Sequence, residues 1–166
     1  MKEQLAFYKR HSRNQTAKDG EEYIRDLLGG EFSIHNAAHD LVVGKWRFEV
    51  KASECSSTDN KKPLSSTRWT WHRILGNTGQ KDYDRLILLG KVDERHRAKY
   101  LDLDSPYVIF DIPIKDAKSF LKGNPPFIQV TTNPDSQRTT NGELFWEFQI
   151  TSEDLKEQYA IEKPPR

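Results

Sequence analysis

Apolar residues recur with helical spacing near the start of the chain. Within residues 16–28, the positions that share one face of a helix are Ala17, Ile24, Leu27 and Leu28. The pair Gly29-Gly30 follows, and glycine directly after the last apolar position commonly ends a helix. The pattern therefore predicts a first helix over residues 16–28.

Strand patterns follow this helix. Short strands are predicted at residues 32–34, 40–43, 46–52, 85–90 and 107–112. In the third of these, apolar and charged residues alternate, so Glu49 and Lys51 are expected on the face opposite Phe48 and Val50. The continuous apolar run at 85–90 is typical of a strand that is buried on both faces.

The remaining segments contain polar and turn-rich stretches. Residues 53–62 read as a loop, and residues 69–75 fit either a helix or an irregular stretch. Pro113 opens a predicted helix over 113–121, and strands at 127–132 and 144–150 flank a turn-rich segment. Thr151 or Ser152 is expected to cap a last helix over 153–159. The order of elements predicts a mixed α/β fold with an open sheet.

Composition limits the class of protein. A chain of 166 residues is expected to form one domain, and its 4 Trp, 6 Tyr and 8 Phe exclude a disordered tail. We expect no membrane span and no secretory leader, because no apolar run is long enough and the N-terminus lacks an apolar stretch. Cys55 is the single cysteine, which excludes an intrachain disulfide and a cysteine-based zinc site and favours a cytoplasmic setting.

Charge is balanced overall but uneven along the chain. The net charge is +1, from 26 Lys and Arg against 25 Asp and Glu. Residues 1–18 carry 5 − 1 = +4, and residues 44–73 carry 7 − 3 = +4. Local basic stretches of this kind can bind phosphate groups, although ordinary solvated surface charge gives the same pattern.

The stretch from residue 39 to residue 53 carries the candidate chemistry. A hairpin would bring Asp40 beside Glu49, and two adjacent carboxylates repel each other unless a cation or a proton lies between them. Mg²⁺ prefers oxygen ligands, which Asp40, Glu49 and the carbonyl of Val50 can supply. Lys51 can hold an attacking water or stabilise charge that develops on phosphorus. The alternative is a surface hairpin with an ordinary Glu–Lys pair.

The spacing Asp40-x8-Glu49-Val50-Lys51 resembles the signature of the PD-(D/E)XK nuclease superfamily, which has the restriction-endonuclease-like fold. The resemblance covers about residues 16–91, including the stretch RWTWHRI and the Asp-Tyr-Asp that precedes the buried strand. It implies a core made of a helix, a three-strand meander, a second helix and a further strand. It also implies an acidic residue that follows a glycine in the first helix. Glu21 fits that place, while His39 stands where the family name has proline.

Several further residues are candidate DNA contacts. They are Arg10, Arg13 and Lys18 before or in the first helix, Ser53, Lys61, Lys62 and Arg68 after the motif strand, Trp69, Arg73 and Gln80, and Gln137 and Arg138 in the turn-rich segment. Each has an alternative interpretation, because loops and hairpins are often exposed segments without a binding role. Two tryptophans spaced as Trp69 and Trp71 are often core residues.

The resemblance implies a metal-dependent DNA endonuclease with Mg²⁺ as cofactor, which Mn²⁺ can replace, and with no organic cofactor. We expect Asp40, Glu49, Lys51 and Glu21 to be catalytic, with metal ligands from Asp40, Glu49, Glu21 and the Val50 carbonyl. One site cuts one strand, so a homodimer on double-stranded DNA is expected, as in restriction or homing enzymes. The expected location is the cytoplasm, at the nucleoid when bound to DNA.

Two other functions stay open. One is a structure-specific nuclease of DNA repair or junctions, and the other is a non-catalytic DNA-binding module on the same fold. The catalytic core is expected over about residues 16–112, with C-terminal β-hairpin and helix additions over 113–166 in the same domain.

Overall fold

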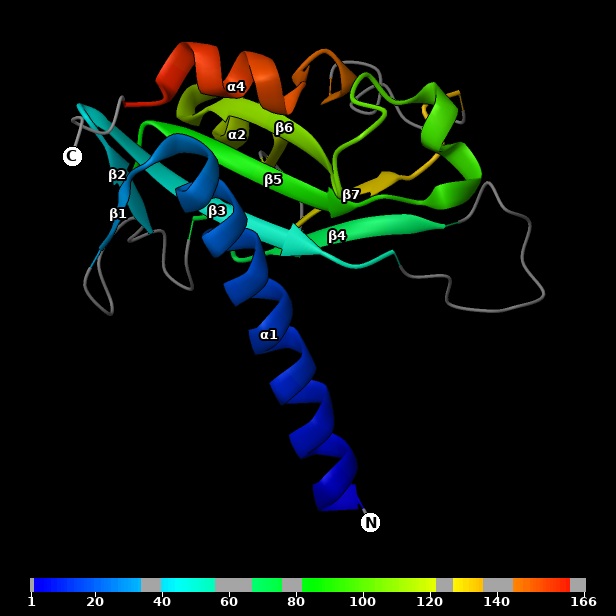
Figure 1. Cartoon of the computed structure of the whole chain (residues 1–166). Coiled ribbons are helices and arrows are strands. Elements are labelled where there is room, and N and C mark those ends of the chain that lie inside the picture. Colours follow the sequence, from blue (N-terminus) through cyan, green and yellow to red (C-terminus); the bar gives the residue numbers. More distant parts are fainter. Residues whose placement is uncertain are drawn as a thin grey trace.

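A computed structural model of the whole chain shows a mixed α/β fold (Figure 1). It describes residues 2–33, 40–55, 67–75, 82–121, 127–135 and 145–161, with the side chains of residues 2–14 and 121 left out. A six-stranded sheet lies at the centre. The first and last helices cover one of its faces, and a two-stranded sheet and a further helix cover the other. None of the helices in these ranges is long and apolar enough to cross a membrane.

The first helix, α1, runs over Lys2–Leu28 and so begins well before the predicted start at residue 16. Three of the four apolar positions that predicted it pack inward, since Ile24 and Leu28 are buried and Leu27 is half-buried, whereas Ala17 is exposed. Its first turns lack such a stripe in the sequence, which explains why periodicity located only the second half. Figure 1 shows the N-terminal part of α1 extending away from the central sheet.

The central sheet contains the predicted meander. Its first strands are β1 (Glu31–Phe32), β2 (Leu41–Val43) and β3 (Trp46–Ser53), and each pairs antiparallel with the next. The buried run forms β5 (Arg85–Lys91), which lies parallel to β3. Strands β6 (Tyr107–Pro113) and β8 (Gln149–Ile150) complete the order β1-β2-β3-β5-β6-β8.

A second sheet replaces the helix that was expected between the meander and the buried strand. The segment after the motif strand forms β4 (Arg68–His72), which pairs antiparallel with β7 (Phe127–Thr131). We call these two strands the β4–β7 ribbon. The alternation of tryptophan with polar residues in β4 is a strand pattern, and the pairing with β7 satisfies its backbone groups.

The C-terminal part differs from the predicted hairpin. Strand β7 pairs with β4 and strand β8 pairs with β6, so the two do not form a hairpin with each other. Helices are found where the sequence predicted them, at α2 (Ile114–Leu121) and α4 (Ser152–Tyr159). The Thr151 side chain caps α4 by accepting a hydrogen bond from the Asp154 N–H at 3.1 Å. A short 3-10 helix, η2 (Glu94–Lys99), follows β5.

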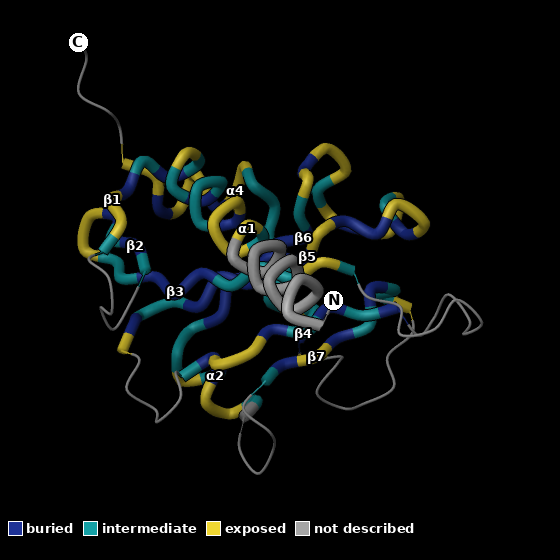
Figure 2. The backbone as a smooth tube through the Cα atoms, turned by 90° about the horizontal axis from the view of Figure 1, so that it is seen from below, coloured by how far each residue is buried: buried dark blue, intermediate teal, exposed yellow. Residues whose placement is uncertain are grey.

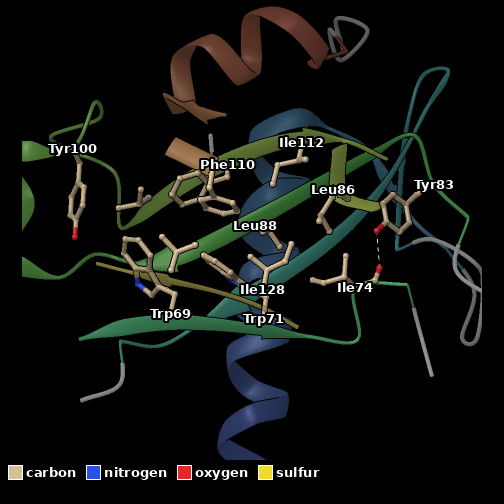
Figure 3. Packing of buried hydrophobic residues seen from close by; sticks show 14 of the residues in the cluster. Trp69, Trp71, Ile74, Tyr83, Leu86, Leu88, Tyr100, Phe110, Ile112 and Ile128 are labelled. Carbon is tan, nitrogen blue, oxygen red and sulfur yellow. Dashed lines mark hydrogen bonds between the residues drawn. The ribbon is translucent and has the colours of Figure 1, made fainter. Parts of the chain in front are cut away.

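Two apolar cores hold the layers together. On one face of the central sheet, Phe48 and Val50 of β3 pack with Ile24 of α1 and Leu155 of α4. On the other face, residues of β5 and β6 pack against the ribbon and α2. Figure 2 shows the buried backbone of the central sheet between the exposed outer elements. Figure 3 shows the side chains of the second core.

Trp69 and Trp71 are the largest residues of the second core, and both are buried, at 0% and 1% exposure. The ring of Trp69 lies directly on Gly90, where an added Cβ would meet the ring at 2.5 Å. The glycine that ends the apolar run of β5 therefore makes room for the tryptophan. Each indole N–H also donates to a β5 carbonyl, of Lys91 at 2.9 Å and of Leu89 at 3.0 Å.

Candidate active site

The hairpin of β2 and β3 brings the two predicted carboxylates together. Leu41 pairs with Phe48, so the same register places Asp40 opposite Glu49. The backbone N–H of Asp40 donates to the Phe48 carbonyl at 2.9 Å. The N–H of Val50 donates to Oδ2 of Asp40 at 3.0 Å, which fixes this carboxylate beside β3 where β2 has ended. This part of the sequence-based prediction is confirmed.

Glu49 lies inside the molecule. Its exposure is 1%, whereas Lys51, two positions on along the same face of β3, is half-buried. The alternation of β3 is as predicted, because Phe48 and Val50 pack toward α1 on the opposite face. A surface Glu–Lys pair would leave the carboxylate in water, so the alternative interpretation of this stretch does not fit the burial of Glu49.

Tyr83 lies close to both carboxylates. Burial raises the pKa of its hydroxyl, and the negative charges of Glu49 and Asp40 raise it further. The hydroxyl donates to the carbonyl of Ile74 at 2.7 Å, as the dashed line in Figure 3 shows. The hydroxyl of Tyr83 therefore holds the chain just after β4, while Tyr83 lies within the electrostatic field of the two carboxylates. Sequence reasoning assigned no role to Tyr83, although it stands in the Asp-Tyr-Asp stretch.

Glu21 follows a close contact between α1 and β3. An added Cβ at Gly20 would meet Cβ of Ala52 at 2.7 Å, so a glycine is needed where the helix crosses the strand. This contact places the backbone of Glu21 one residue from the crossing and near the end of the motif strand. Glu21 itself is half-buried.

The oxygen donors of Asp40, Glu49 and the Val50 carbonyl can supply part of the ligands of a divalent cation. Among the described residues, no three histidine, cysteine, aspartate or glutamate side chains form a group that could hold a metal ion. The structure does bring together Asp40 and Glu49, and the Val50 carbonyl belongs to the same stretch of β3 as the N–H that binds Asp40. Two hard carboxylates and a carbonyl suit Mg²⁺, which usually keeps several waters.

Arg47 forms a cluster that the sequence analysis missed. Its guanidinium binds Asp84 at 3.1 Å and Asp82 at 3.0 Å, and its backbone N–H donates to Asp84 at 2.9 Å. The hydrogen bond to Asp84 is the largest of the effects that raise the pKa of Arg47. The cluster ties the start of β5 to β3. The alternation of β3 predicts Arg47 on the same face as Glu49, and this pattern was the sequence signal that pointed toward the cluster.

Two candidate DNA contacts have structural roles instead. Trp69 was wrongly predicted as a stacking residue, because it is fully buried on Gly90. The hydroxyl of Ser53 accepts a hydrogen bond from the Thr70 N–H and donates to the Glu54 carbonyl, both at 3.0 Å. Ser53 therefore anchors β4 to β3.

The other candidates divide by position. Lys18 and Arg73 are exposed, and Arg68 is half-buried on β4. The predictions for His39, Lys61, Lys62, Gln80, Gln137 and Arg138 lie outside the described residues, as do the side chains of Arg10 and Arg13.

No protein-family model matches the chain, and no curated protein matches it. The assignment of function therefore depends on the chain's own residues, above all on Asp40, Glu49 and Lys51 and on the elements that position them.

Proposed function

We propose that this protein is a metal-dependent DNA endonuclease. The observation that carries the proposal is the buried carboxylate of Glu49, which stands opposite Asp40 on a strand whose next same-face residue is Lys51. A buried carboxylate beside a second one is costly unless a cation or a proton compensates the charge, and a bound cation is the form that this proposal takes. The arrangement matches what phosphodiester hydrolysis requires: ligands for a cation and a nearby ammonium group.

Each residue has a proposed role. Asp40, Glu49 and the carbonyl of Val50 hold Mg²⁺, or Mn²⁺ in its place, and Glu21 assists from α1. When bound, such a cation lowers the pKa of a coordinated water and offsets charge on the phosphate. Lys51 positions the attacking water or stabilises the developing negative charge. The hydrogen bond from Val50 to Asp40 keeps that carboxylate in place before any substrate binds.

The order of elements supports a restriction-endonuclease-like core. A helix is followed by the meander β1-β2-β3 and by a further strand, β5, as the resemblance implies, and β5 lies parallel to β3. The departure is β4, a strand of the second sheet in the place of the expected helix. The acid pair and the parallel β3–β5 pairing do not depend on that helix.

The proposed substrate is double-stranded DNA. One such site cuts one strand, so we propose that two copies act together on a site with two-fold character, in restriction or homing.

Cleavage of plasmid and phage DNA by the full chain tests the proposal. We expect cleavage with Mg²⁺ or Mn²⁺ and none with a chelator. Asp40→Asn and Glu49→Gln should each lower the cleavage rate by at least about a thousandfold, since each removes a ligand charge. A matched control is Glu153→Gln, an exposed acid on α4, which should leave the rate unchanged.

Binding measurements separate catalysis from binding. We expect the Asp40 and Glu49 variants to bind duplex DNA about as tightly as the native chain in a chelator. If the native chain binds duplex DNA but cuts none, even in a randomised library with either metal, the protein is a binding module and the nuclease proposal fails.

A further inference from the structure

Among the described residues, one face of the β4–β7 ribbon belongs to neither apolar core. Trp69, Trp71, Ile128 and Val130 point toward the central sheet and are buried. The alternate positions point the other way and form register pairs across the ribbon, namely Arg68 with Thr131, Thr70 with Gln129, and His72 with Phe127. We call these six residues the outer ribbon face.

The chemistry of the outer ribbon face suits nucleic acid. Neither strand contains an aspartate or a glutamate, and Arg68 and His72 contribute basic groups. Arginine and glutamine are the side chains that bind guanine and adenine edges through two hydrogen bonds each. Gln129 is exposed, and one N–H of its amide donates to the Thr70 hydroxyl at 3.1 Å. That bond orients the amide and leaves its oxygen and second N–H for a base.

Arg68 in β4 and Arg73, which directly follows β4, differ from five other described arginines. The arginines that bind carboxylates are Arg25, Arg47, Arg85, Arg95 and Arg97. In the part of the chain that the structure describes, Arg68 and Arg73 form no ion pair, and the buried Nε of Arg68 has no hydrogen-bond partner. Within the described residues, no carboxylate neutralises the charge of either arginine.

The ribbon is fixed at two points, one at the end of β3 and one at Tyr83. The Ser53 hydroxyl binds the N–H of Thr70 at 3.0 Å, and the Tyr83 hydroxyl binds the carbonyl of Ile74 at 2.7 Å. Between them Arg73 takes a left-handed backbone conformation, with φ of 56°, which is strained for a residue other than glycine. The strand therefore ends in a sharp turn that holds an exposed arginine close to Tyr83, the neighbour of Glu49.

The dimensions fit the major groove of DNA. That groove is about 12 Å wide and admits a two-stranded ribbon. Outward side chains along one strand are about 6.8 Å apart, which equals two base-pair steps of about 3.4 Å. Three rows of outward residues therefore span roughly four to five base pairs.

We propose that the outer ribbon face lies in the major groove of duplex DNA and reads base edges there. Arg68 and Gln129 bind bases, and Arg73 binds a backbone phosphate next to the acid pair. The inference rests on the proposed function, which supplies duplex DNA as the substrate. It assigns the sequence preference to β4 and β7 instead of the turn-rich segment that follows β7.

Selection from a fully randomised duplex library tests the proposal. The full chain is incubated with the library in a chelator, and the bound duplexes are sequenced. We expect the native chain to enrich a short motif. Gln129→Ala should lower the preference at one position of that motif by about ten- to hundredfold. The matched control Gln158→Ala, exposed on α4 behind the opposite face of the central sheet, should select the native motif.

The arginines give two further readouts. Arg68→Lys keeps the charge but loses the planar fork, so it should relax the preference at one position and keep the salt dependence of binding. Arg73→Ala should keep the motif and make the plot of log affinity against log salt shallower by about 0.9, as expected when one phosphate is no longer bound. Circular dichroism of each variant confirms that the fold is retained.

Opposite outcomes overturn the inference. If the Arg68 and Gln129 variants select the native motif, the ribbon does not read bases. If the native chain binds duplexes without enriching any motif, or binds only single strands or protein, the assignment to the groove is wrong. Metal-dependent cleavage by the native chain is scored separately, so the nuclease proposal can stand while this inference fails, and the reverse.

Discussion

At the scale of single residues, Asp93 shows how one buried acid joins distant segments. It is 5% exposed, and its carboxylate accepts hydrogen bonds from Arg95 and from the Thr132 hydroxyl, both at 2.7 Å. Arg95 also donates to the hydroxyl of Thr67 at 2.6 Å. Burial raises the pKa of Asp93, but the hydrogen bonds from Arg95 and Thr132 outweigh it and lower the pKa to about 2.

The depressed pKa of Asp93 predicts a pH-dependent stability. An acid whose pKa is lower in the folded chain stabilises it above about pH 4, and this contribution is lost as the pH falls toward 2. The free energy of unfolding of the native chain should exceed that of Asp93→Asn by about 2 kcal/mol at neutral pH, and the difference should shrink by about 1 kcal/mol near pH 3. Urea unfolding at both pH values measures it. A difference that stays constant with pH contradicts the prediction.

Residue patterns predicted the position of the acid pair better than they predicted the burial of the tryptophans. Asp40 and Glu49 meet across a tight hairpin, so local alternation and spacing were sufficient to place them. The burial of Trp69 depends on Gly90, which belongs to a strand that pairs elsewhere. A local pattern contains no information about such distant contacts.

At the scale of elements, the position of the ribbon depends on a few hydrogen bonds at its ends. Tyr83 holds the chain after β4 through the Ile74 carbonyl. Tyr83→Phe removes this bond and leaves a buried carbonyl unsatisfied, which should lower the free energy of unfolding by about 1–2 kcal/mol.

Hydrogen exchange locates the effect of Tyr83→Phe. Faster exchange should appear at residues 73–75 and along β4, while the exchange of β6 changes only with global stability. Tyr107→Phe is the matched control, since Tyr107 is only half-buried. Equal exchange at β4 in both variants would show that Tyr83 does not hold this end of the ribbon.

The sequence predicted most elements but not how they pair. Periodicity located β3, β5, β6, α2 and α4, because each has its own apolar pattern. It proposed a hairpin between the strands at 127–132 and 144–150, whereas their partners are β4 and β6. A strand edge accepts any suitable neighbour, so the partner is chosen by the packing of whole layers.

At the scale of the whole molecule, α1 is about 40 Å long, from 27 residues at about 1.5 Å each. The described contacts of α1 with the sheet involve its second half, where Thr16 binds Glu54 and Gly20 meets Ala52. The first half contains Lys2, Lys9, Arg10 and Arg13 against Glu3. It adds positive charge that extends away from the sheet (Figure 1).

Removal of residues 2–14 tests the role of this extension. We expect nearly the same thermal unfolding temperature, and weaker DNA binding whose salt dependence is shallower by about 0.9 for each phosphate that the extension would otherwise bind. A full-length control with the four basic residues changed to glutamine separates charge from length, and it should match the truncated chain. If the truncated chain binds DNA as tightly as native, the basic extension takes no part in binding.

The two sheets also differ in how far apart their partners lie along the chain. Strands β2 and β3 join through a tight turn, whereas β4 pairs Arg68 with Thr131. Closing the longer loop costs more chain entropy, and contacts of high sequence separation form slowly. On the ribosome the hairpin with Asp40 and Glu49 can form once residue 53 has emerged, but the ribbon must wait for residue 131. A growing chain therefore acquires its carboxylate pair well before the outer ribbon face, which we propose to read the DNA sequence.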